Sequence, residues 1–314
     1  MRYEVCTVVV TYNPHIPLFK EVIARLKEQT DKVIVVDNHS SNSEEIAATV
    51  DELSAKLVSM SENTGIAHAQ NVGAAYGIEQ NAKYILFMDQ DTILPDGAVD
   101  NLCDACGELE AEGIKVGSIG HAYRDTHDDK IKPSFKARGH RLVKQDVCSE
   151  SVTVIETDFV IASGSLIPTV SLQEVGLMDE TLFIDLVDVE WGLRALSLGY
   201  RNFQSAKKIM THTLGNGRLN FFGKSISLHA PIRDYYVIRN SIFMLRRKYI
   251  GLPWKFYFFK RIIPFFVVFG FFADQKKKRL YFMTRGLVDG LLNRGGKYVP
   301  HWFLNAAVAQ RLPR

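Results

Sequence analysis

The first part of the sequence predicts an α/β fold in which helices flank a parallel sheet. Short runs rich in β-branched residues alternate there with segments whose apolar residues recur at helical spacing. Only a few residues connect one segment to the next, which is typical of strand–helix–strand units. The 314 residues, of which 46% are hydrophobic, are sufficient for a large core.

The predicted elements of this part follow one another in order. Four runs are typical of strands, at residues 5–12, 32–37, 56–63 and 84–91. Helical spacing occurs between them, at residues 16–30, 43–55 and 65–82. The third of these helices is rich in Gly and Ala, which predicts close packing against the sheet.

Cysteine usage favours a reducing compartment. Cys103 and Cys106 form a C-x-x-C inside the helix-like segment 98–113, but no second pair follows at zinc-site spacing, so we interpret them as packing residues. Four Cys in a chain of this length do not make a disulfide framework. Nothing before the first strand resembles a cleavable signal, so we expect a cytoplasmic protein.

Polar residues lie at the carboxyl ends of all four predicted strands, at positions 11–13, 37–38, 63 and 89–91. Ligands of parallel α/β sheets bind beyond the carboxyl ends of the strands, so we expect these side chains to share one site. The first strand is not followed by G-x-G-x-x-G, and the chain has no G-x-x-x-x-G-K-[ST]. A dinucleotide fingerprint or a P-loop is therefore not predicted.

Asp89 and Asp91 stand one residue apart, directly after the apolar run 84–88. Asp is common in turns, so an ordinary strand-to-turn junction is one interpretation. Two carboxylates at this spacing are also suited to hold a hard divalent cation together with the phosphates that it carries. The coincidence of four polar strand ends favours the metal site.

A second acidic cluster consists of Asp185, Asp188 and Glu190. If the segment that follows is a helix, Asp188 lies near its N-terminus, where the helix dipole favours an ionised carboxylate. Glu190 precedes Arg194 by four residues, so a salt bridge on one helix face is the structural interpretation of this acid.

Three basic residues farther along have both structural and functional interpretations. His212 lies in a Gly-rich turn, where a lone His more often stabilises the fold than binds a ligand. Arg233 and Arg239 fit either a solvated helix face or contacts to a diphosphate, which the planar guanidinium group suits.

Residues 124–147 are predicted to form a long polar loop.

Seven segments between residues 5 and 245 identify a family. They are VVTYNP, VVDNHSSN, ENTGIAHAQNVGAAYG, FMDQDTILPDGAV, ASGSLIP, GLMDETLFIDLVDVEWGLRA and RDYYVIRNS. With these segments in this order, the chain resembles the inverting family-two glycosyltransferases of the GT-A fold. It is most similar to the bacterial rhamnosyltransferases that build O-antigen and other surface polysaccharides. The resemblance implies a Rossmann-like nucleotide-diphospho-sugar transferase fold and hexosyltransferase activity.

The resemblance also implies roles for individual residues. The residues that it implies for donor-nucleotide binding are Thr11, Tyr12, Asn13, Asp37, Asn63, Gly65, Asn71 and Asp89. The metal, Mg²⁺ or Mn²⁺, would be held by Asp89, Asp91 and, by a looser match, His212. Asp188 matches the general base. Glu190, Arg233 and Arg239 would lie near the diphosphate or the acceptor.

The implied chemistry is consistent with these residue types. A nucleotide diphosphate leaves readily once a divalent cation neutralises its charge. The acceptor hydroxyl loses a proton as it attacks, and one positioned carboxylate is sufficient as the base. Direct displacement with one base inverts the anomeric centre, so dTDP-β-L-rhamnose would give an α linkage. We prefer Asp188 to Glu190 as the base because Arg194 is within reach of Glu190.

The C-terminal part differs in composition from the rest. From residue 255 onward the chain has 12 Lys+Arg and 2 Asp, whereas the first 254 residues have 26 Lys+Arg and 33 Asp+Glu. The uncharged run 262–273 is shorter than the ~20 apolar residues that span a bilayer. Basic residues flank it on both sides, which favours a helix lying in the membrane interface over a spanning segment. Packing on the catalytic domain is the structural alternative.

We therefore expect a GT-A domain at 1–250 and a helical, basic, membrane-associating extension at 251–314. The expected partners are dTDP-L-rhamnose, a saccharide or lipid-linked saccharide acceptor, and the inner face of the cell membrane. One alternative is the same fold with a UDP-hexose donor. A second is a non-catalytic nucleotide-sugar-binding subunit, against which Asp89, Asp91 and Asp188 argue. No nucleic-acid partner is expected, because the basic residues flank a stretch too apolar for a phosphate-tracking arm.

Overall fold

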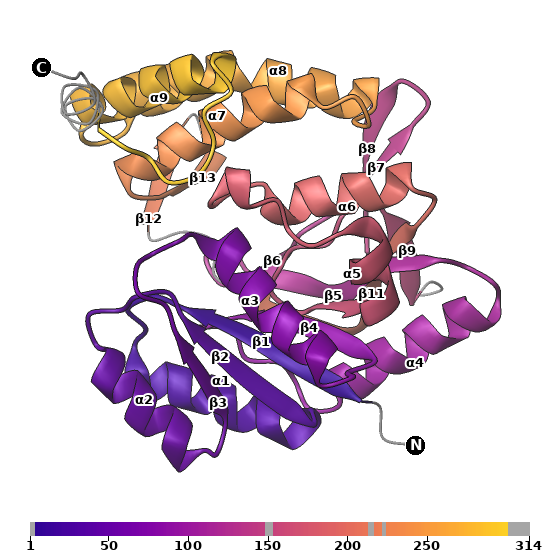
Figure 1. Ribbon diagram of the computed structural model, residues 1–314. Coiled ribbons are helices and arrows are strands. Elements are labelled where there is room, and N and C mark those ends of the chain that lie inside the picture. The colour runs from indigo at the N-terminus through magenta and orange to yellow at the C-terminus, as the bar shows by residue number, and fades with distance from the viewer. Residues whose placement is uncertain (1–3, 148–152, 213–216, 222–223, 301–314) are drawn as a thin grey trace, which may run out of the picture.

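The structure, a computed structural model, describes residues 4–147, 153–212, 217–221 and 224–300 (Figure 1). Within these residues the central sheet is mixed and has nine strands. They are β1 (Val5–Thr11), β2 (Lys32–Asp37), β3 (Lys56–Ser59), β4 (Tyr84–Asp89), β5 (Val116–Asp125), β6 (Lys130–Ile131), β9 (Val154–Thr157), β10 (Ser165–Pro168) and β11 (Arg201–His212). Their order is β3-β2-β1-β4-β10-β5-β11-β9, and β6 pairs with β5.

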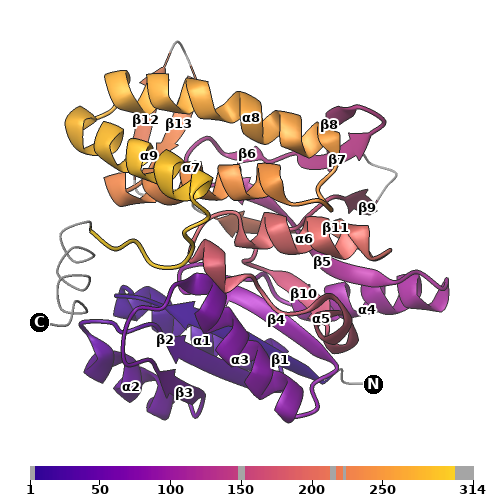
Figure 2. The same cartoon turned by 45° about the horizontal axis from the view of Figure 1, so that its top comes forward.

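Helices cover both faces of this sheet (Figures 1 and 2). One face carries α1 (Ile16–Gln29), α2 (Ser43–Glu52) and α4 (Ala98–Ala111). The opposite face carries α3 (Ile66–Glu79), α5 (Thr169–Val175) and α6 (Val187–Ser197). Side chains of a strand alternate between the faces, so Val5 and Val9 of β1 join the first core, whereas Cys6 and Val8 join the second.

The predicted parallel sheet of the first part is confirmed. β3, β2, β1 and β4 are parallel neighbours. Thr11 pairs with Asp37, and Val10 pairs with Asp89, so three strands end at one edge of the sheet. The close packing of α3 is also confirmed: a Cβ atom at Gly73 would lie 2.2 Å from Val8 Cγ1. Cys103 and Cys106 are buried on α4 with free thiols, as expected for packing residues.

The middle of the chain is more ordered than the predicted polar loop. Residues 124–147 include β6 and a hairpin of β7 (Ser134–Arg138) with β8 (Arg141–Gln145). Most of the hairpin's side chains are only partly buried, which accounts for its polar composition. The Asp158 carboxylate links the hairpin to the helix that contains Trp254. It accepts hydrogen bonds from Ala137 N at 2.7 Å and from Trp254 Nε1 at 2.6 Å.

A short 3-10 helix, η1 (Glu180–Leu182), precedes α6. After β11, β12 (Gly217–Phe221) and β13 (Lys224–Leu228) form a hairpin, and the last described part of the chain is helical. It consists of α7 (Pro231–Arg246), α8 (Leu252–Val267), one π-helical turn (Val268–Phe272) and α9 (Lys276–Leu291). These helices form a layer over α6, on the side of the molecule away from α1 and α2 (Figures 1 and 2). None of the helices in the described ranges is long and apolar enough to cross a membrane.

The helical layer is closely packed within itself and is tied to the sheet half by the segment after α9. A Cβ atom at Gly286 of α9 would lie 2.3 Å from Tyr235 O, so α9 lies directly against α7. After α9 the chain returns to the sheet half, where Gly296 N donates to Thr181 O at 2.7 Å and Lys297 pairs with Glu62 at 3.1 Å. The boundary at 250/251 stays a prediction.

Candidate active site

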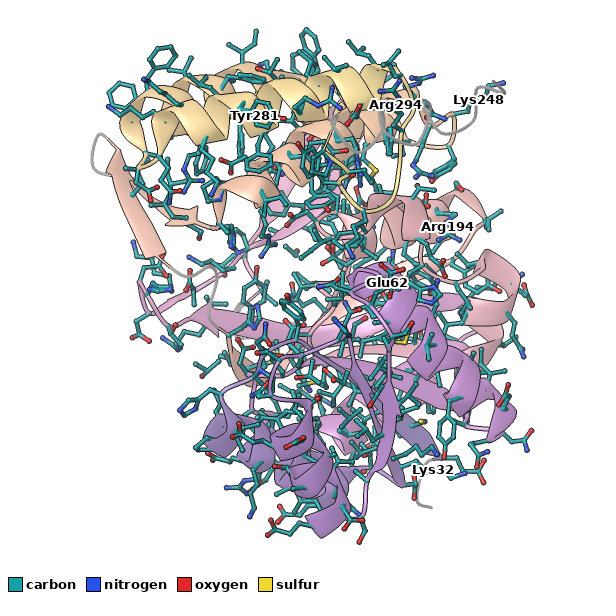
Figure 3. The ribbon with its side chains drawn as sticks, turned by 60° about the vertical axis from the view of Figure 1, so that its left-hand side comes forward. Lys32, Glu62, Arg194, Lys248, Tyr281 and Arg294 are labelled. Atoms are coloured by element: carbon teal, nitrogen blue, oxygen red, sulfur yellow. The ribbon has the colours of Figure 1, made fainter. Side chains whose placement is uncertain are left out.

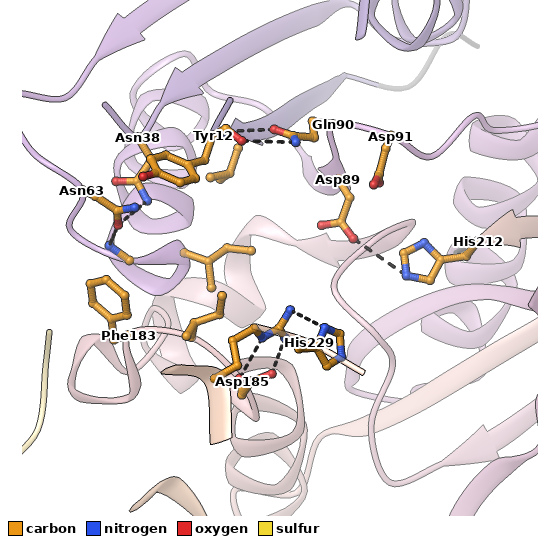
Figure 4. Close-up of a pocket in the computed structure, with 15 residues that line it drawn as sticks. Tyr12, Asn38, Asn63, Asp89, Gln90, Asp91, Phe183, Asp185, His212 and His229 are labelled. Carbon is orange, nitrogen blue, oxygen red and sulfur yellow. Dashed lines mark hydrogen bonds and ion pairs between the residues drawn. The ribbon is translucent and has the colours of Figure 1, made fainter. Parts of the chain in front are cut away.

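A cavity of about 540 Å³ lies beyond the carboxyl ends of β1, β2 and β4 (Figure 4). Its volume is in the range of small-molecule sites. Seven of the predicted site residues line it: Tyr12, Asn63, Gly65, Asp89, Asp91, His212 and Arg233. The strand-end argument therefore located the cavity.

Gln90 joins two of the strand ends. Its Oε1 accepts hydrogen bonds from Thr11 Oγ1 at 2.9 Å and from Tyr12 N at 2.7 Å. The acidic turn after β4 is thereby fixed to the end of β1, and the Tyr12 side chain, 49% exposed, borders the cavity (Figure 4). Sequence reasoning gave Gln90 no role, because nothing in the local pattern shows that it bonds to another strand.

Thr11, Asn13 and Asp37 do not line the cavity but support its wall. The Asn13 Oδ1 accepts a hydrogen bond from Ser41 N at 2.7 Å, and Asp37 accepts one from Ser40 N at 3.1 Å. Asn13 has φ of 49°, a conformation that Asn adopts more readily than most residues. These residues shape the loops that carry the lining side chains.

The opposite end of this wall is built around Asn63. Its Oδ1 accepts from Asn38 Nδ2 at 3.2 Å and from Gly65 N at 3.1 Å. Gly65 has φ of 89°, and a Cβ atom there would lie 2.5 Å from the Phe183 ring. Only glycine fits this contact without displacing the aromatic wall.

Asp89, Asp91 and His212 meet at one corner of the cavity (Figure 4). His212 Nε2 lies 3.9 Å from Asp89 Oδ2, and its Nδ1 hydrogen-bonds Thr92 Oγ1 at 2.8 Å. The buried Thr92 therefore directs Nε2 towards the carboxylate. Asp91 is exposed and has no hydrogen-bond or ion-pair partner among the described residues.

This corner fits a divalent cation that is also bound by phosphate oxygens. Burial raises the pKa of Asp89 and the Asp91 carboxylate adds to the shift, whereas His212 opposes it. A cation would relieve the repulsion between the two carboxylates, and carboxylate oxygens suit Mg²⁺ or Mn²⁺. Within the described ranges, however, no three His, Cys, Asp or Glu side chains form a complete metal site. Ligands from the donor would have to complete the coordination.

The facing wall of the cavity comes from the second half of the chain. Arg233, in the first turn of α7, donates from Nε to Asp185 Oδ2 at 3.1 Å and lies 3.2 Å from His229 Nδ1. Phe183 stacks on Tyr236 of α7, with ring centroids 5.0 Å apart. Sequence reasoning gave Asp185 and His229 no role, because only the folded chain brings them to Arg233.

Asp188 lies outside this cavity, in a smaller one that Ser165 and Trp191 also line. Its Oδ2 accepts from Ala162 N at 3.3 Å, and the neighbouring Ser163 Oγ accepts from Asp89 N at 3.2 Å, so one loop joins the Asp188 carboxylate to the backbone of Asp89. Burial raises the pKa of Asp188 to about 6, although hydrogen bonds from backbone amides act in the opposite direction. A carboxyl group of this kind accepts a proton readily near neutral pH.

The comparisons with known proteins identify the family of the chain. The family described as "Glycosyl transferase family 2" matches residues 6–162. A curated protein of Shigella flexneri named "dTDP-rhamnosyl transferase RfbF" is 30% identical over 305 residues, which are 95% of this chain and 99% of that protein. The chain belongs to glycosyl transferase family 2.

Solved structures support the GT-A fold of this glycosyltransferase. S. aureus TarS residues 1–349, in complex with UDP-GlcNAc, matches with a TM-score of 0.58 and 16% identity over 93% of this chain and 81% of TarS. GalNAc-T7 with UDP, GalNAc and Mn²⁺ matches with a TM-score of 0.55 and 10% identity, over 92% of this chain and 56% of that one. At these identities the likeness concerns the fold alone.

Three further predicted site residues of the glycosyltransferase do not line the cavity. The Asn71 side chain accepts a hydrogen bond from Met178 N at 2.8 Å and donates one to Met178 O at 2.9 Å. Glu190 is fully buried and binds Arg194 at 2.9 Å, so the predicted salt bridge forms in the protein interior. The Arg239 guanidinium is also fully buried and donates to backbone carbonyls, including Leu182 O at 2.8 Å. Their side chains are committed to packing, and we assign them no contact with the donor.

Proposed function

We propose that this glycosyltransferase transfers L-rhamnose from dTDP-β-L-rhamnose, with inversion, to a saccharide in surface-polysaccharide synthesis such as that of O-antigen. The observation that carries the proposal is the 30% identity to a dTDP-rhamnosyl transferase along nearly the whole of both chains. The acceptor is lipid-linked in this proposal, and the protein is peripheral on the inner face of the cell membrane.

The cavity supports the donor part of the proposal. Tyr12, Asn38 and Asn63 offer an aromatic ring and amide groups to the nucleotide. Arg233 borders the same space across from Asp91 and supplies positive charge for the diphosphate. A divalent cation bound at Asp89 and Asp91, with His212 beside it, would act as Lewis acid and stabilise the leaving dTDP.

Asp188 is the base in this mechanism. Its carboxylate takes the proton from the acceptor hydroxyl as that oxygen bonds to the anomeric carbon. The bond from that carbon to the diphosphate oxygen breaks on the opposite side, and dTDP leaves. The raised pKa of Asp188 favours proton uptake. Glu190 is excluded from this step because it is fully buried in an ion pair with Arg194.

A donor panel tests the proposal. We would measure hydrolysis or transfer with dTDP-L-rhamnose, UDP-glucose, UDP-galactose and UDP-GlcNAc, in Mg²⁺, Mn²⁺ or EDTA, for the wild type and Asp188→Asn. We expect metal-dependent turnover of dTDP-L-rhamnose alone, lost in the variant. Turnover of a UDP-hexose instead would overturn the rhamnosyl donor and keep the fold. Binding of a donor without any turnover on membrane-derived acceptor would favour a non-catalytic subunit.

A further inference from the structure

The outward side of α8 is a continuous apolar stripe. We call it the α8 face and define it as Leu252, Phe256, Phe259, Ile263 and Val267. Their spacing of three or four residues puts them on one side of the helix, and each is at least 42% exposed. The opposite side of α8 buries Trp254 and Phe258 in the core. The stripe therefore remains after the core is complete.

The stripe continues into the turn before α9. Phe271 and Phe272 are 60% and 51% exposed, although Val268 and Phe269 just before them are buried. We call residues 271–278, which include the start of α9, the docking turn. Figure 3 shows α8 and α9 as the outermost layer, with Tyr281 at the opposite end of the molecule from Lys32.

Positive charge surrounds this apolar surface. Lys276, Lys277 and Lys278 are all exposed in the docking turn, and Lys260 is exposed on α8. The nearby Asp274 is paired with Arg279 at 2.8 Å, and the three lysines of the docking turn outnumber this one carboxylate. An apolar stripe with a cationic rim is complementary to anionic headgroups above acyl chains. Two copies of the chain meeting through this surface would bring their cationic rims together.

The dimensions favour a helix lying in the interface. α8 has 16 residues, or about 24 Å at 1.5 Å per residue, and the hydrocarbon core is about 30 Å thick. Its far side is packed on the protein, so lipid has access to the α8 face alone.

We propose that the α8 face and the docking turn are the surface on which this protein binds an anionic lipid bilayer. The inference rests on the proposed function, which needs access to a lipid-linked acceptor, and it names the side chains that provide this access. The aromatic and aliphatic side chains enter the interface, and the three lysines bind headgroups.

The docking turn is joined to the wall of the cavity. Arg279, directly after it, is buried and donates from Nη1 to Asp234 Oδ2 at 2.8 Å and from Nη2 to His229 O at 3.0 Å. These two residues flank the cavity residue Arg233. A bilayer bound at the turn is thus connected, through one buried side chain, to the wall that faces the donor. An acceptor held in that bilayer is brought close to the active site.

Flotation of the intact protein with vesicles tests the proposal. We would compare vesicles of phosphatidylcholine with vesicles that also contain phosphatidylglycerol. We expect the wild type to float with the anionic vesicles, and the double variant Phe259→Glu, Ile263→Glu to bind about tenfold more weakly or worse. Replacing Lys276, Lys277 and Lys278 by Gln should weaken anionic binding about tenfold or more at low salt.

The matched control is Val170→Glu with Leu198→Glu. Both residues are apolar and 52% exposed, and they lie on other elements, so this variant should float like the wild type. A wild type that stays out of both vesicles overturns the proposal, as does a face variant that floats like the control. A dimer that the face variant abolishes, without vesicle binding, would assign the surface to a second copy instead.

Hydrolysis of dTDP-L-rhamnose in the same preparations separates this proposal from the proposed function. None of the substituted side chains lines the cavity, so each variant should hydrolyse the donor at the wild-type rate without vesicles. Hydrolysis without vesicle binding would overturn the docking surface alone. Vesicle binding without turnover of this donor would overturn the rhamnosyl proposal alone.

Discussion

The two walls of the cavity are built in different ways. The wall formed by residues 11–91 consists of strand ends, where β1, β2 and β4 stop at one edge of the sheet. The wall formed by residues 183–185, 229 and 233 is held by contacts between distant segments, such as the pairing of Arg233 with Asp185 across 48 residues. A regular sheet is sufficient to place the first set of side chains, whereas the second depends on the packing of α7.

The difference predicts how each wall responds to substitution. Side chains at strand ends can change without loss of the fold, because the backbone that carries them is fixed by the sheet. On the facing wall, one buried side chain often supports several backbone segments, so catalytic and structural effects have to be separated. Three pairs of variants, from the largest expected effect to the smallest, test this comparison.

Asp188 and Glu190, two residues apart on α6, are expected to differ most. Asp188→Asn should lower the transfer rate about a thousandfold while donor binding is retained, because the proton acceptor is lost. Glu190→Gln should leave the rate near that of the wild type but lower the free energy of unfolding by on the order of 2 kcal/mol, because the buried partner of Arg194 loses its charge. Steady-state kinetics and urea unfolding measure the two effects.

The pH dependence provides a second measurement on the same pair. Burial raises the pKa of Asp188 to about 6, and a base is active only when deprotonated. The rate should therefore fall about tenfold per pH unit on the acid side of an apparent pKa at or below about 6, since a bound cation lowers the value. Asp188→Asn should lack this limb. An acid limb that survives in Asp188→Asn would assign the base to another residue.

Arg233 and Arg239 form the second pair, six residues apart on α7. Arg233→Met should raise the donor KM by between about tenfold and a hundredfold, because a charged hydrogen-bond donor leaves the cavity. Arg239→Met should instead lower the free energy of unfolding by about 3 kcal/mol, because buried carbonyls such as Leu182 O lose their donor. A higher donor KM for folded Arg239→Met would show that the facing wall transmits packing changes to the cavity.

Thr92, next to the strand-end wall, tests the corner of Asp89, Asp91 and His212, and the expected effect is the smallest. Thr92→Val keeps the shape but removes the hydroxyl that bonds His212 Nδ1 at 2.8 Å, so the ring loses its orientation. Calorimetric titration of Mn²⁺ in the presence of dTDP should show about tenfold weaker metal binding. Thr92→Ser restores the hydroxyl and should restore the affinity. Equal affinities for Val and Ser would remove His212 from the metal corner.

Sequence reasoning was accurate where one local pattern decides the structure. Residues such as Asp89 and Asp91 follow apolar strands, and parallel strands bring their carboxyl ends together. It was less accurate where the pattern has two meanings. RDYYVIRNS contains two arginines at helical spacing, but only the fold decides that Arg233 borders the cavity and Arg239 is buried under the chain near Gly296.

Other features have no local signal at all. Gln90 bonds to Tyr12, directly after β1, across 78 residues of sequence, and His229 reaches the cavity because α7 begins two residues after it. Residues 124–147 were predicted as a loop because a two-stranded hairpin with exposed sides has the composition of a loop. The exposure of the α8 face also required the structure, since packing and membrane contact select the same apolar residues.

The return of the chain after α9 has a consequence for biosynthesis. The buried guanidinium of Arg239 needs Gly296 O as one of its partners, so the facing wall lacks part of its support until almost the whole chain has emerged from the ribosome. Domains form from the N-terminus during translation, and the strand-end wall can therefore fold first. The enzyme would become active only after the segment that carries its lysine-rich turn has been made. With the proposed docking surface, a nascent chain would thus be unable to consume donor before it could bind a membrane.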